Sequence, residues 1–396
     1  MSRILIVHEH YQQRGGEDAV VEAEIRLLES HGHTVVIYTR ENSDLKDHNP
    51  FRMIKAGFDT VWAEKSAQEI RAIIEKAKPD ICHFHNTFPL ISPSGYKPCV
   101  DSGIPVIQTL HNYRLLCPAA SFLREGKVCE DCLGRSVAWP GIVHDCYRGS
   151  RSATTAVAAM LTTHRFLGTW RDKVDMYVAL SEFAKQKFIR GGLPAERIVV
   201  KPNFIANDPG TRKGGGEYVL FVGRLSEEKG LRVLLDAWSQ LRNFIPLRIA
   251  GDGPLTDEIT VRANAIDASG RTIMGPLSPK QVIQAMKGAR FLVFPSVWFE
   301  AFGLSMIEAF ACGLPVIASR LGSMEEIVTN GLTGLHFTAG DSVDLASKVH
   351  WAWTHPKEMS EMGDNGRLEY EGKYTPDRNY EHFVRLWNHL GIDVRS

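Results

Sequence analysis

The sequence predicts an α/β protein made of two doubly wound domains in tandem. Short apolar runs of strand length alternate with longer segments of helical periodicity, a pattern typical of parallel sheets covered by helices. The polar, glycine-rich stretch "ANDPGTRKGGGE" (206–217) interrupts the alternation once, after which it starts again. A chain of 396 residues is also too long for one hydrophobic core. We therefore predict domains at 1–205 and 217–374, a linker at 206–216 and a final helical segment at 375–396.

The composition is that of an ordinary globular protein. Apolar residues make up 44% and charged residues 23% of the chain, which argues against a disordered or fibrous class. Lys+Arg and Asp+Glu are both 46, so no global charge favours a nucleic acid partner. The N-terminal apolar run is too short for a signal peptide, and no uninterrupted run of about 18 apolar residues occurs. We expect a soluble, cytoplasmic protein.

The first half of the chain contains strands and helices in regular order. "RILIVH" (3–8) is an apolar strand, "AVVEAEIRLLESHGH" has helical spacing that ends at Gly32, and "TVVIYT" (34–39) is the next strand. A strand, helix, strand unit of this length normally joins parallel neighbours. Later strands are expected in "PDICHFHN" (79–86), "IPVIQTLHN" (104–112), "KVDMYVALSEFAKQKFIRGG" (173–192), which also holds a helix, and "RIVVKPNFI" (197–205).

The second half repeats this alternation. Strands are expected in "YVLFVG", "LRIAG", "RTIMG", "RFLVFPS", "PVIAS" and "TGLHFT", with helices between them. The two domains should face each other across a cleft. The tail "TPDRNYEHFVRLWNHLG" (375–391) reads as one amphipathic helix that follows the completed second sheet, and we expect it to pack back across the first domain.

The segment "EAFGLSMIE" (300–308) predicts a site for a nucleotide sugar. Glu300 lies in the loop after a strand and Glu308 inside the next helix, which begins near Gly303 and Leu304. Free N–H groups at a helix N-terminus favour a phosphate, and a glycine lets it approach closely. A carboxylate accepts two hydrogen bonds, so Glu300 would hold the sugar and Glu308 the ribose. On spacing alone, a helix cap followed by a solvated glutamate is an equally good reading.

A second segment favours the phosphate reading. "VGRLSEEKG" (222–230) follows the first strand of the same domain and places Arg224 and Lys229 at that strand's carboxyl end. These cations would neutralise the charge that grows on a departing diphosphate.

These motifs, together with "FPSVWFEAFGLSMIEAFACGLPVIAS" (294–319), "GDGP" (251–254) and "GPLSP" (275–279), resemble the family four glycosyltransferases over essentially the whole chain. The resemblance implies the GT-B fold and retaining transfer of a sugar from a nucleoside diphosphate sugar, UDP- or GDP-linked, without a catalytic metal. It implies roles for Glu300 at the donor sugar, Glu308 at the ribose, and Arg224 and Lys229 at the diphosphate.

The resemblance also assigns the remaining site residues. The "GPLSP" loop would face the nucleobase through its backbone, and a histidine near the reacting sugar matches His111. The glycine pair in "RGGEDAV" (14–20) would touch donor phosphate and acceptor, although such a pair in a turn is common. His85 and His83 should share one face of a strand. The further donor-side residues are Gly16, Gly275, Leu277, Phe302, Gly303 and Leu304, and the acceptor-side residues are Gly15, His85 and Asn112. "HEH" (8–10) lacks the spacing of a metalloprotease motif, and we dismiss it as a metal site.

Four cysteines crowd into an insertion at 114–150. Cys117, Cys129, Cys132 and Cys146 have spacings C-x11-C-x2-C-x13-C, a reasonable pattern for structural zinc, with His144 as an alternative ligand. An iron–sulfur cluster, free thiols or disulfides are the other readings.

After the insertion, 147–171 carries four arginines and no acid, which suits either a membrane surface and a lipid-linked acceptor or a buried helix with arginines at its ends. We predict a glycosyltransferase that acts on a glycan, lipid-linked or small-molecule acceptor in polysaccharide or glycoconjugate biosynthesis. The alternatives are a nucleotide-sugar epimerase or hydrolase of the same fold, or a non-catalytic nucleotide-sugar-binding protein.

Overall fold

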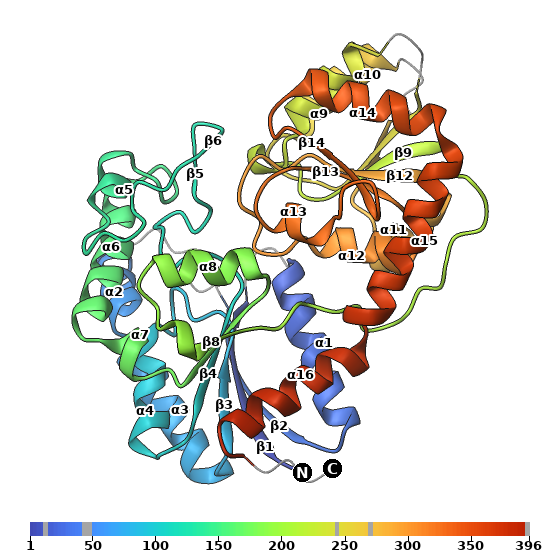
Figure 1. The fold of residues 1–396 in the computed structure, drawn as a ribbon. Helices are drawn as coiled ribbons and strands as arrows, with labels where there is room; N and C mark the ends of the chain where they lie inside the picture. The colour runs from blue at the N-terminus through green and yellow to red at the C-terminus, as the bar shows by residue number, and fades with distance from the viewer. Residues whose placement is uncertain (11–14, 42–49, 242–244, 268–271, 393–396) are drawn as a thin grey trace. The chain divides into compact units, whose positions relative to one another are not determined.

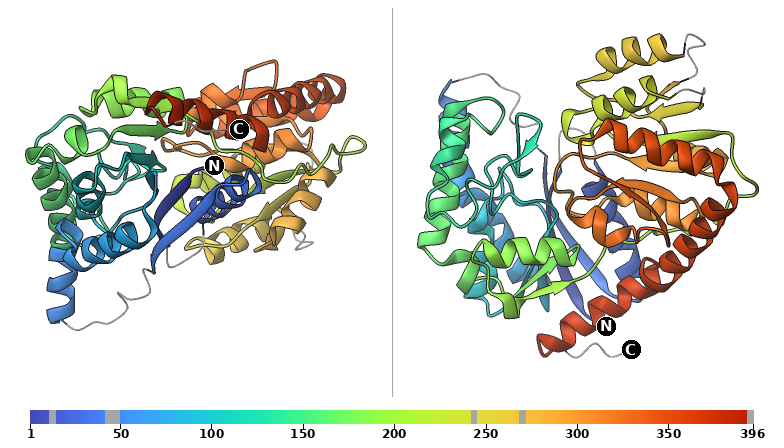
Figure 2. Two further views of the ribbon diagram at one scale, coloured as in Figure 1. Left: turned by 90° about the horizontal axis from the view of Figure 1, so that it is seen from below. Right: turned by 45° about the horizontal axis from the view of Figure 1, so that its top comes forward.

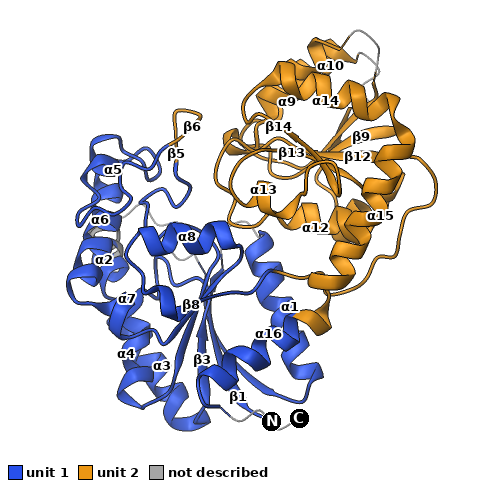
Figure 3. Ribbon diagram, in the orientation of Figure 1, with its two compact units in different colours: residues 1–122, 129–202, 379–396 blue, residues 123–128, 203–378 orange. Residues whose placement is uncertain are grey.

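The computed structural model describes residues 1–10, 15–41, 50–241, 245–267 and 272–392, except for the side chains of 50–54 and 56. The chain divides into two compact units (Figure 3). Unit 1 consists of Met1–Phe122, Cys129–Pro202 and Asn379–Ser396, and unit 2 of Leu123–Val128 and Asn203–Arg378.

Unit 1 is built on a six-stranded parallel sheet with the order β2-β1-β3-β4-β7-β8 (Figure 1). Its strands are β1 (Arg3–His10), β2 (Thr34–Glu41), β3 (Ile81–Phe84), β4 (Val106–Leu110), β7 (Met176–Ala179) and β8 (Ile198–Val200). Its helices are α1 (Gly16–Ser30), α2 (Pro50–Val61), α3 (Glu64–Ala77), α4 (Tyr96–Asp101), α5 (Trp139–Val143), α6 (Arg151–Phe166), α7 (Thr169–Asp172) and α8 (Glu182–Arg190).

One face of this sheet is covered by α1 and by α16 (Pro376–His389), which lies beside α1 in both figures (Figures 1 and 2). Phe383, Leu386 and Trp387 of α16 join Val21 and Leu28 of α1 in the same buried cluster as the apolar strand residues. Each fully buried side chain of this size contributes roughly 1.5–3 kcal/mol. The amphipathic tail that the sequence predicts is thus part of the core of unit 1.

Unit 2 repeats the architecture, with the strand order β11-β10-β9-β12-β13-β14, all parallel. The order reverses at β9 and β12, where such sheets bind ligands outside the carboxyl ends of the strands. Its strands are β9 (Tyr218–Val222), β10 (Leu247–Ala250), β11 (Ile273–Gly275), β12 (Ala289–Phe294), β13 (Val316–Ser319) and β14 (Gly334–Phe337). Its helices are α9 (Leu231–Ser239), α10 (Thr256–Ile266), α11 (Pro279–Gly288), α12 (Leu304–Ala311), α13 (Ser323–Ile327), α14 (Ser342–Thr354) and α15 (Pro356–Lys373).

A small hairpin of β5 (Leu123–Arg124) and β6 (Lys127–Val128) also belongs to unit 2. The core of unit 2 lies between its sheet and α9, α10 and α14, with Leu234, Trp238 and Val349 among its buried side chains. None of the described helices combines the length and the apolar character that crossing a membrane would require.

Candidate donor and acceptor sites

The carboxyl edge of the unit 2 sheet joins a lysine to a buried glutamate. Lys229 follows β9 and Glu300 follows β12, and the Lys229 Nζ donates to the Glu300 Oε1 at 2.6 Å. The Ser296 hydroxyl donates to the same oxygen at 2.7 Å, and the Ser323 hydroxyl donates to the Glu300 carbonyl at 2.7 Å. Two predicted residues are thus brought together, and of two serines that the sequence analysis missed, Ser296 holds the carboxylate and Ser323 holds the backbone of Glu300.

Glycines allow the loop that carries Lys229 to pack closely against the neighbouring loops. A Cβ on Gly230 would lie 1.9 Å from the Pro295 carbonyl oxygen, and one on Gly251 would lie 1.9 Å from the Gly223 carbonyl oxygen. Both glycines have positive φ, at 69° and 144°. The Val297 N–H also donates to the Glu228 carbonyl at 2.9 Å. The "VGRLSEEKG", "GDGP" and "FPSVWFE" loops therefore form one packed edge.

Arg224 lies in the same loop but is exposed, and it forms no ion pair with any residue that the structure describes. Lys229 also packs within 5.6 Å of the Phe294 ring and 5.5 Å of the Trp298 ring. This edge therefore carries one positioned cation and one uncommitted cation.

The helix that follows Glu300 has the start that the sequence predicts. Gly303 is the N-cap of α12 in a left-handed conformation, with φ 98° and ψ 66°. Leu304 is the first helical residue, Glu308 lies on the second turn, and Phe302 is buried. Burial raises the pKa of Glu308 to about 7. Gly275 ends β11, and Leu277 is half-buried in the loop after it.

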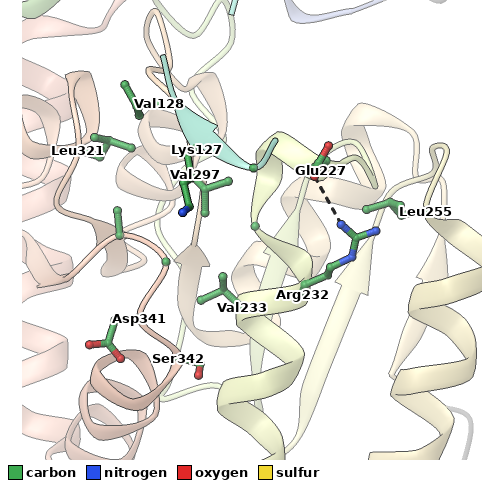
Figure 4. Close-up of a pocket in the computed structure, with 14 residues that line it drawn as sticks. Lys127, Val128, Glu227, Arg232, Val233, Leu255, Val297, Leu321, Asp341 and Ser342 are labelled. Atoms are coloured by element: carbon green, nitrogen blue, oxygen red, sulfur yellow. Dashed lines mark ion pairs between the residues drawn. The ribbon is translucent and has the colours of Figure 1, made fainter. Parts of the chain in front are cut away.

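A cavity of about 770 Å³ lies beside this edge, between the hairpin and the loops around α9 and α14 (Figure 4). None of the residues that line it is a predicted donor-site or acceptor-side residue, although Gly230 and Glu227 flank Lys229. Figure 4 shows the Lys127 side chain at this pocket and the ion pair of Arg232 with Glu227, at 3.6 Å. The full lining is Gly126, Lys127, Val128, Glu227, Gly230, Arg232, Val233, Leu255, Val297, Leu321, Ala339, Gly340, Asp341 and Ser342.

In unit 1, the carboxyl ends of β1, β3 and β4 gather histidines. The rings of His85 and His83 have centroids 4.2 Å apart and are tilted by 33°, as expected for neighbours on one face. The His85 Nδ1 and the His111 Nε2 are 2.9 Å apart, and Asn112 follows His111 directly. Burial lowers the pKa values of both His85 and His111 well below the usual range, which keeps the two rings neutral.

Asp18, which the sequence reading missed, ties α1 to β1. Its Oδ1 lies 2.9 Å from the His8 Nε2 and 3.1 Å from the His10 Nδ1, while its Oδ2 accepts the Gly15 N–H at 2.9 Å. Burial alone would raise the pKa of Asp18, but these hydrogen bonds outweigh it and lower the pKa to about 2. Gly15 and Gly16 are exposed, and a Cβ on Gly15 would meet nothing within 4 Å.

Among the described residues, two groups of side chains have ligand atoms within 4.8 Å of one another and could hold a metal ion. One is His8, His10 and Asp18; the other is Glu24, His83 and His85. The first is already joined by hydrogen bonds. In the second, the Lys201 ammonium lies 2.5 Å from Glu24, which disfavours a further cation there.

The cysteines of the insertion lie near one another without forming such a group. Cys117 and Cys132 are buried, and Cys129 and Cys146 are half-buried. Burial raises the pKa of the Cys132 thiol to about 11, with smaller contributions from the other three thiols. These cysteines belong to neither of the two groups of described residues that could hold a metal ion.

Comparison with known proteins identifies the class. The model for glycosyl transferases group 1 matches residues 205–369, and the model for glycosyltransferase family 4 matches residues 14–208. The chain belongs to the family four, group 1 glycosyltransferases.

Curated relatives are consistent with this family. D-rhamnosyltransferase WbpZ of Pseudomonas aeruginosa is 32% identical over 165 residues, which cover 41% of this chain and 43% of that protein. O-antigen chain mannosyltransferase C of Escherichia coli is 29% identical over 178 residues, covering 44% and 47%. The chain thus spans about half the length of these relatives.

The fold matches solved structures over nearly the whole chain. HepE of Anabaena in complex with UDP and glucose has a TM-score of 0.70 at 17% identity, with 98% of this chain and 100% of that chain covered. Sucrose-phosphate synthase of Thermosynechococcus elongatus has a TM-score of 0.69 at 17% identity, with 98% and 99% covered. The predicted fold class, two parallel-sheet α/β domains of the GT-B type, is confirmed.

Proposed function

We propose that this protein is a glycosyltransferase that moves a sugar from a nucleoside diphosphate sugar to a hydroxyl of a glycan, lipid-linked or small-molecule acceptor. The observation that carries the proposal is the Lys229–Glu300 pair at the carboxyl edge of β9 and β12, beside the glycine-capped start of α12. A held cation suits a diphosphate and a held carboxylate suits sugar hydroxyls. The relatives' names, among them rhamnosyltransferase and mannosyltransferase, favour transfer over epimerisation, hydrolysis or mere binding.

The roles follow from the residues at each sheet edge. Lys229 and Arg224 neutralise the diphosphate, Glu300 and Phe302 contact the donor sugar, and Glu308 holds the ribose. The backbone of Gly275 and Leu277 faces the nucleobase, and Gly303 and Leu304 bind phosphate at the start of α12. In unit 1, His111 lies near the reacting sugar, Gly16 contacts the donor, and Gly15, His85 and Asn112 are on the acceptor side. The open space around Gly15 supports this role, because no contact with the described residues requires glycine at that position.

Transfer is proposed to retain the anomeric configuration and to use no catalytic metal. The cations of Arg224 and Lys229 supply the charge stabilisation that a metal gives elsewhere. No described carboxylate is assigned as a nucleophile, so the acceptor hydroxyl would attack on the face from which the diphosphate leaves.

The decisive experiment is a transfer assay with the full chain. Thermal shifts with UDP-, GDP-, ADP- and TDP-sugars first select the donor, because a ligand that binds only the folded state raises the midpoint. We expect one donor class to raise it, sugar transfer to an added acceptor to persist in EDTA, and the product to keep the donor's anomeric configuration by NMR. Glu300→Gln should lower kcat by at least ~100-fold. Turnover unaffected by this substitution would refute the donor-site assignment.

Two further proposals concern the insertion and the surface after it. A structural zinc held by Cys117, Cys129, Cys132 and Cys146 is proposed from their C-x11-C-x2-C-x13-C spacing alone. In the described structure their thiols do not form a group of ligand atoms within 4.8 Å of one another. Metal analysis of reduced protein should give one zinc per chain, and none would refute it.

We also propose cytoplasmic residence with peripheral membrane contact. The membrane contact is supported by Phe166 and Leu167, which are 93% and 55% exposed at the end of the arginine-bearing α6. Co-sedimentation with anionic liposomes that Phe166→Ser leaves unchanged would refute the membrane contact.

A further inference from the structure

A buried network of polar side chains lies behind His111 in unit 1. The Lys201 Nζ donates to the Glu24 Oε1 at 2.5 Å, the other Glu24 oxygen lies 3.6 Å from the His85 Nε2, and the His85 Nδ1 lies 2.9 Å from the His111 Nε2. Glu24, His85 and Lys201 are almost completely excluded from solvent. This network therefore links α1, the end of β8 and the ends of β3 and β4.

The positions of the histidine ring protons in this network can be assigned from its charges. His85 and His111 are neutral, so each carries one N–H. Neither the Glu24 Oε2 nor the His85 Nε2 has a hydrogen-bond partner within the described structure, and the two atoms face each other. A lone pair on the His85 Nε2 would be repelled by the carboxylate, whereas an N–H is attracted to it. The proton of His85 therefore belongs on Nε2.

The assignment propagates to His111. With its proton on Nε2, His85 can only accept at Nδ1, so the 2.9 Å contact requires an N–H on the His111 Nε2. The Nδ1 of His111 then carries a lone pair, and no described residue hydrogen-bonds to it. His83 is not part of this network, because its Nε2 is 2.8 Å from the Thr109 hydroxyl.

We propose that Glu24 and His85 are positioning residues that hold His111 in the Nε2–H tautomer, so that its Nδ1 accepts a hydrogen bond from a substrate hydroxyl. Lys201 fixes the Glu24 carboxylate, and it is itself held by the Asn379 side chain of α16 at 3.2 Å. The tautomer follows from the contacts together with the neutrality of the two rings, whereas the substrate hydroxyl rests on the proposed function. His111 would thus recognise an uncharged sugar hydroxyl rather than donate to a phosphate.

The first test is NMR of the full chain labelled with ¹⁵N-histidine, with His111→Gln and His85→Gln used only to assign signals. We expect Nε2–H for both His85 and His111 in the unaltered protein. An Nδ1–H on His111 overturns the proposal, and this result needs no variant to fold.

The second test is Glu24→Gln. Lys201 has only donors, so it should draw the amide oxygen to itself and leave the amide NH₂ facing the His85 Nε2. Both histidines should then change to the Nδ1–H tautomer. Glu22→Gln is the matched control, because Glu22 lies on the same helix but pairs with Arg26 at the surface. Unchanged tautomers in folded Glu24→Gln overturn the proposal.

Kinetics separate this proposal from the proposed function. In Glu24→Gln we expect kcat for sugar transfer to fall ~10- to 100-fold, as for other partners that orient a functional histidine. The Kd for the nucleoside diphosphate should stay within about twofold of the unaltered protein. If the tautomers change as expected but neither protein transfers sugar to any acceptor, the proposed function fails and the assignment of the tautomer stands. A changed tautomer with unchanged kcat overturns the role of His111 as an acceptor.

Discussion

Replacing Glu308 with glutamine should remove a pH dependence of stability from this protein. Burial raises the pKa of Glu308 from 4.5 to about 7 in the folded protein, and the unfolded chain loses the same proton near pH 4.5. Between these values the folded state holds a proton that the unfolded state has lost. The free energy of unfolding therefore falls as pH rises from 4.5 through 7, and this cost is absent below 4.5.

The size of the effect follows from the same interval. At about 1.4 kcal/mol for each pH unit, the charged Glu308 costs about 3 kcal/mol above pH 7. Urea unfolding should show Glu308→Gln within about 1 kcal/mol of the unaltered protein at pH 5 and more stable by about 3 kcal/mol at pH 8. Glu358→Gln, at an exposed glutamate of α15, controls for the lost charge. A stability difference for Glu308→Gln that does not change between pH 5 and 8 would refute the reasoning.

The binding role proposed for Glu308 adds a second measurement. If its ionised carboxylate accepts the ribose hydroxyls, nucleotide binding must displace its proton when the pH is below 7. Calorimetry with UDP at pH 6 in buffers of different ionisation enthalpy should report release of up to about one proton, and none from Glu308→Gln. Equal proton release from both proteins would contradict the ribose contact.

Three further outcomes are expected. In urea unfolding, Lys201→Met should lower the free energy of unfolding by about 3–5 kcal/mol, because it leaves a buried Glu24 unpaired. Adding Glu24→Gln should restore most of that loss. Equal stability of the single and double variants would contradict the buried pair. Lys229→Met should weaken UDP binding at least ~10-fold by calorimetry, since it removes a charge-assisted contact, and an unchanged Kd would remove Lys229 from the diphosphate site. Gly230→Ala should lower the free energy of unfolding by about 1–3 kcal/mol or more, because the positive φ and the Pro295 carbonyl leave no room for a Cβ. Thermal unfolding measures this change, and an unchanged stability would contradict the packed loop.

The sequence predicted much of this architecture because parallel strands covered on both faces read as continuous apolar runs. The helix predicted after "KVDMYVALS" is α8, and Ser181 caps it by accepting the Ala184 N–H, as its position before Glu182 indicates. Loops after parallel strands meet at one edge, so the proximity of Lys229 to Glu300 could be expected from two separate motifs.

The contacts behind His111 could not be predicted in the same way. Lys201 and Glu24 are 177 residues apart, and the strand order places β3, β4 and β7 between β8 and β1, so neither sequence nor strand adjacency predicts that they pair. One signal was available. Glu24 lies within the apolar stripe of its helix, between Val21 and Leu28, which are both buried. A carboxylate at such a position is rarely tolerated without a partner.

The two sheet edges differ in a way that bears on what each can bind. The edge of unit 2 presents Lys229 and the exposed Arg224, permanent cations that suit a diphosphate. The edge of unit 1 presents His111, which burial keeps neutral like His85 behind it, and the Lys201 ammonium is already committed to Glu24. A neutral, hydrogen-bonding surface distinguishes hydroxyl groups by donor and acceptor geometry rather than by charge. This division follows from buried chemistry within each unit, and it supports the proposal that one edge binds the charged part of a nucleotide sugar and the other a hydroxyl.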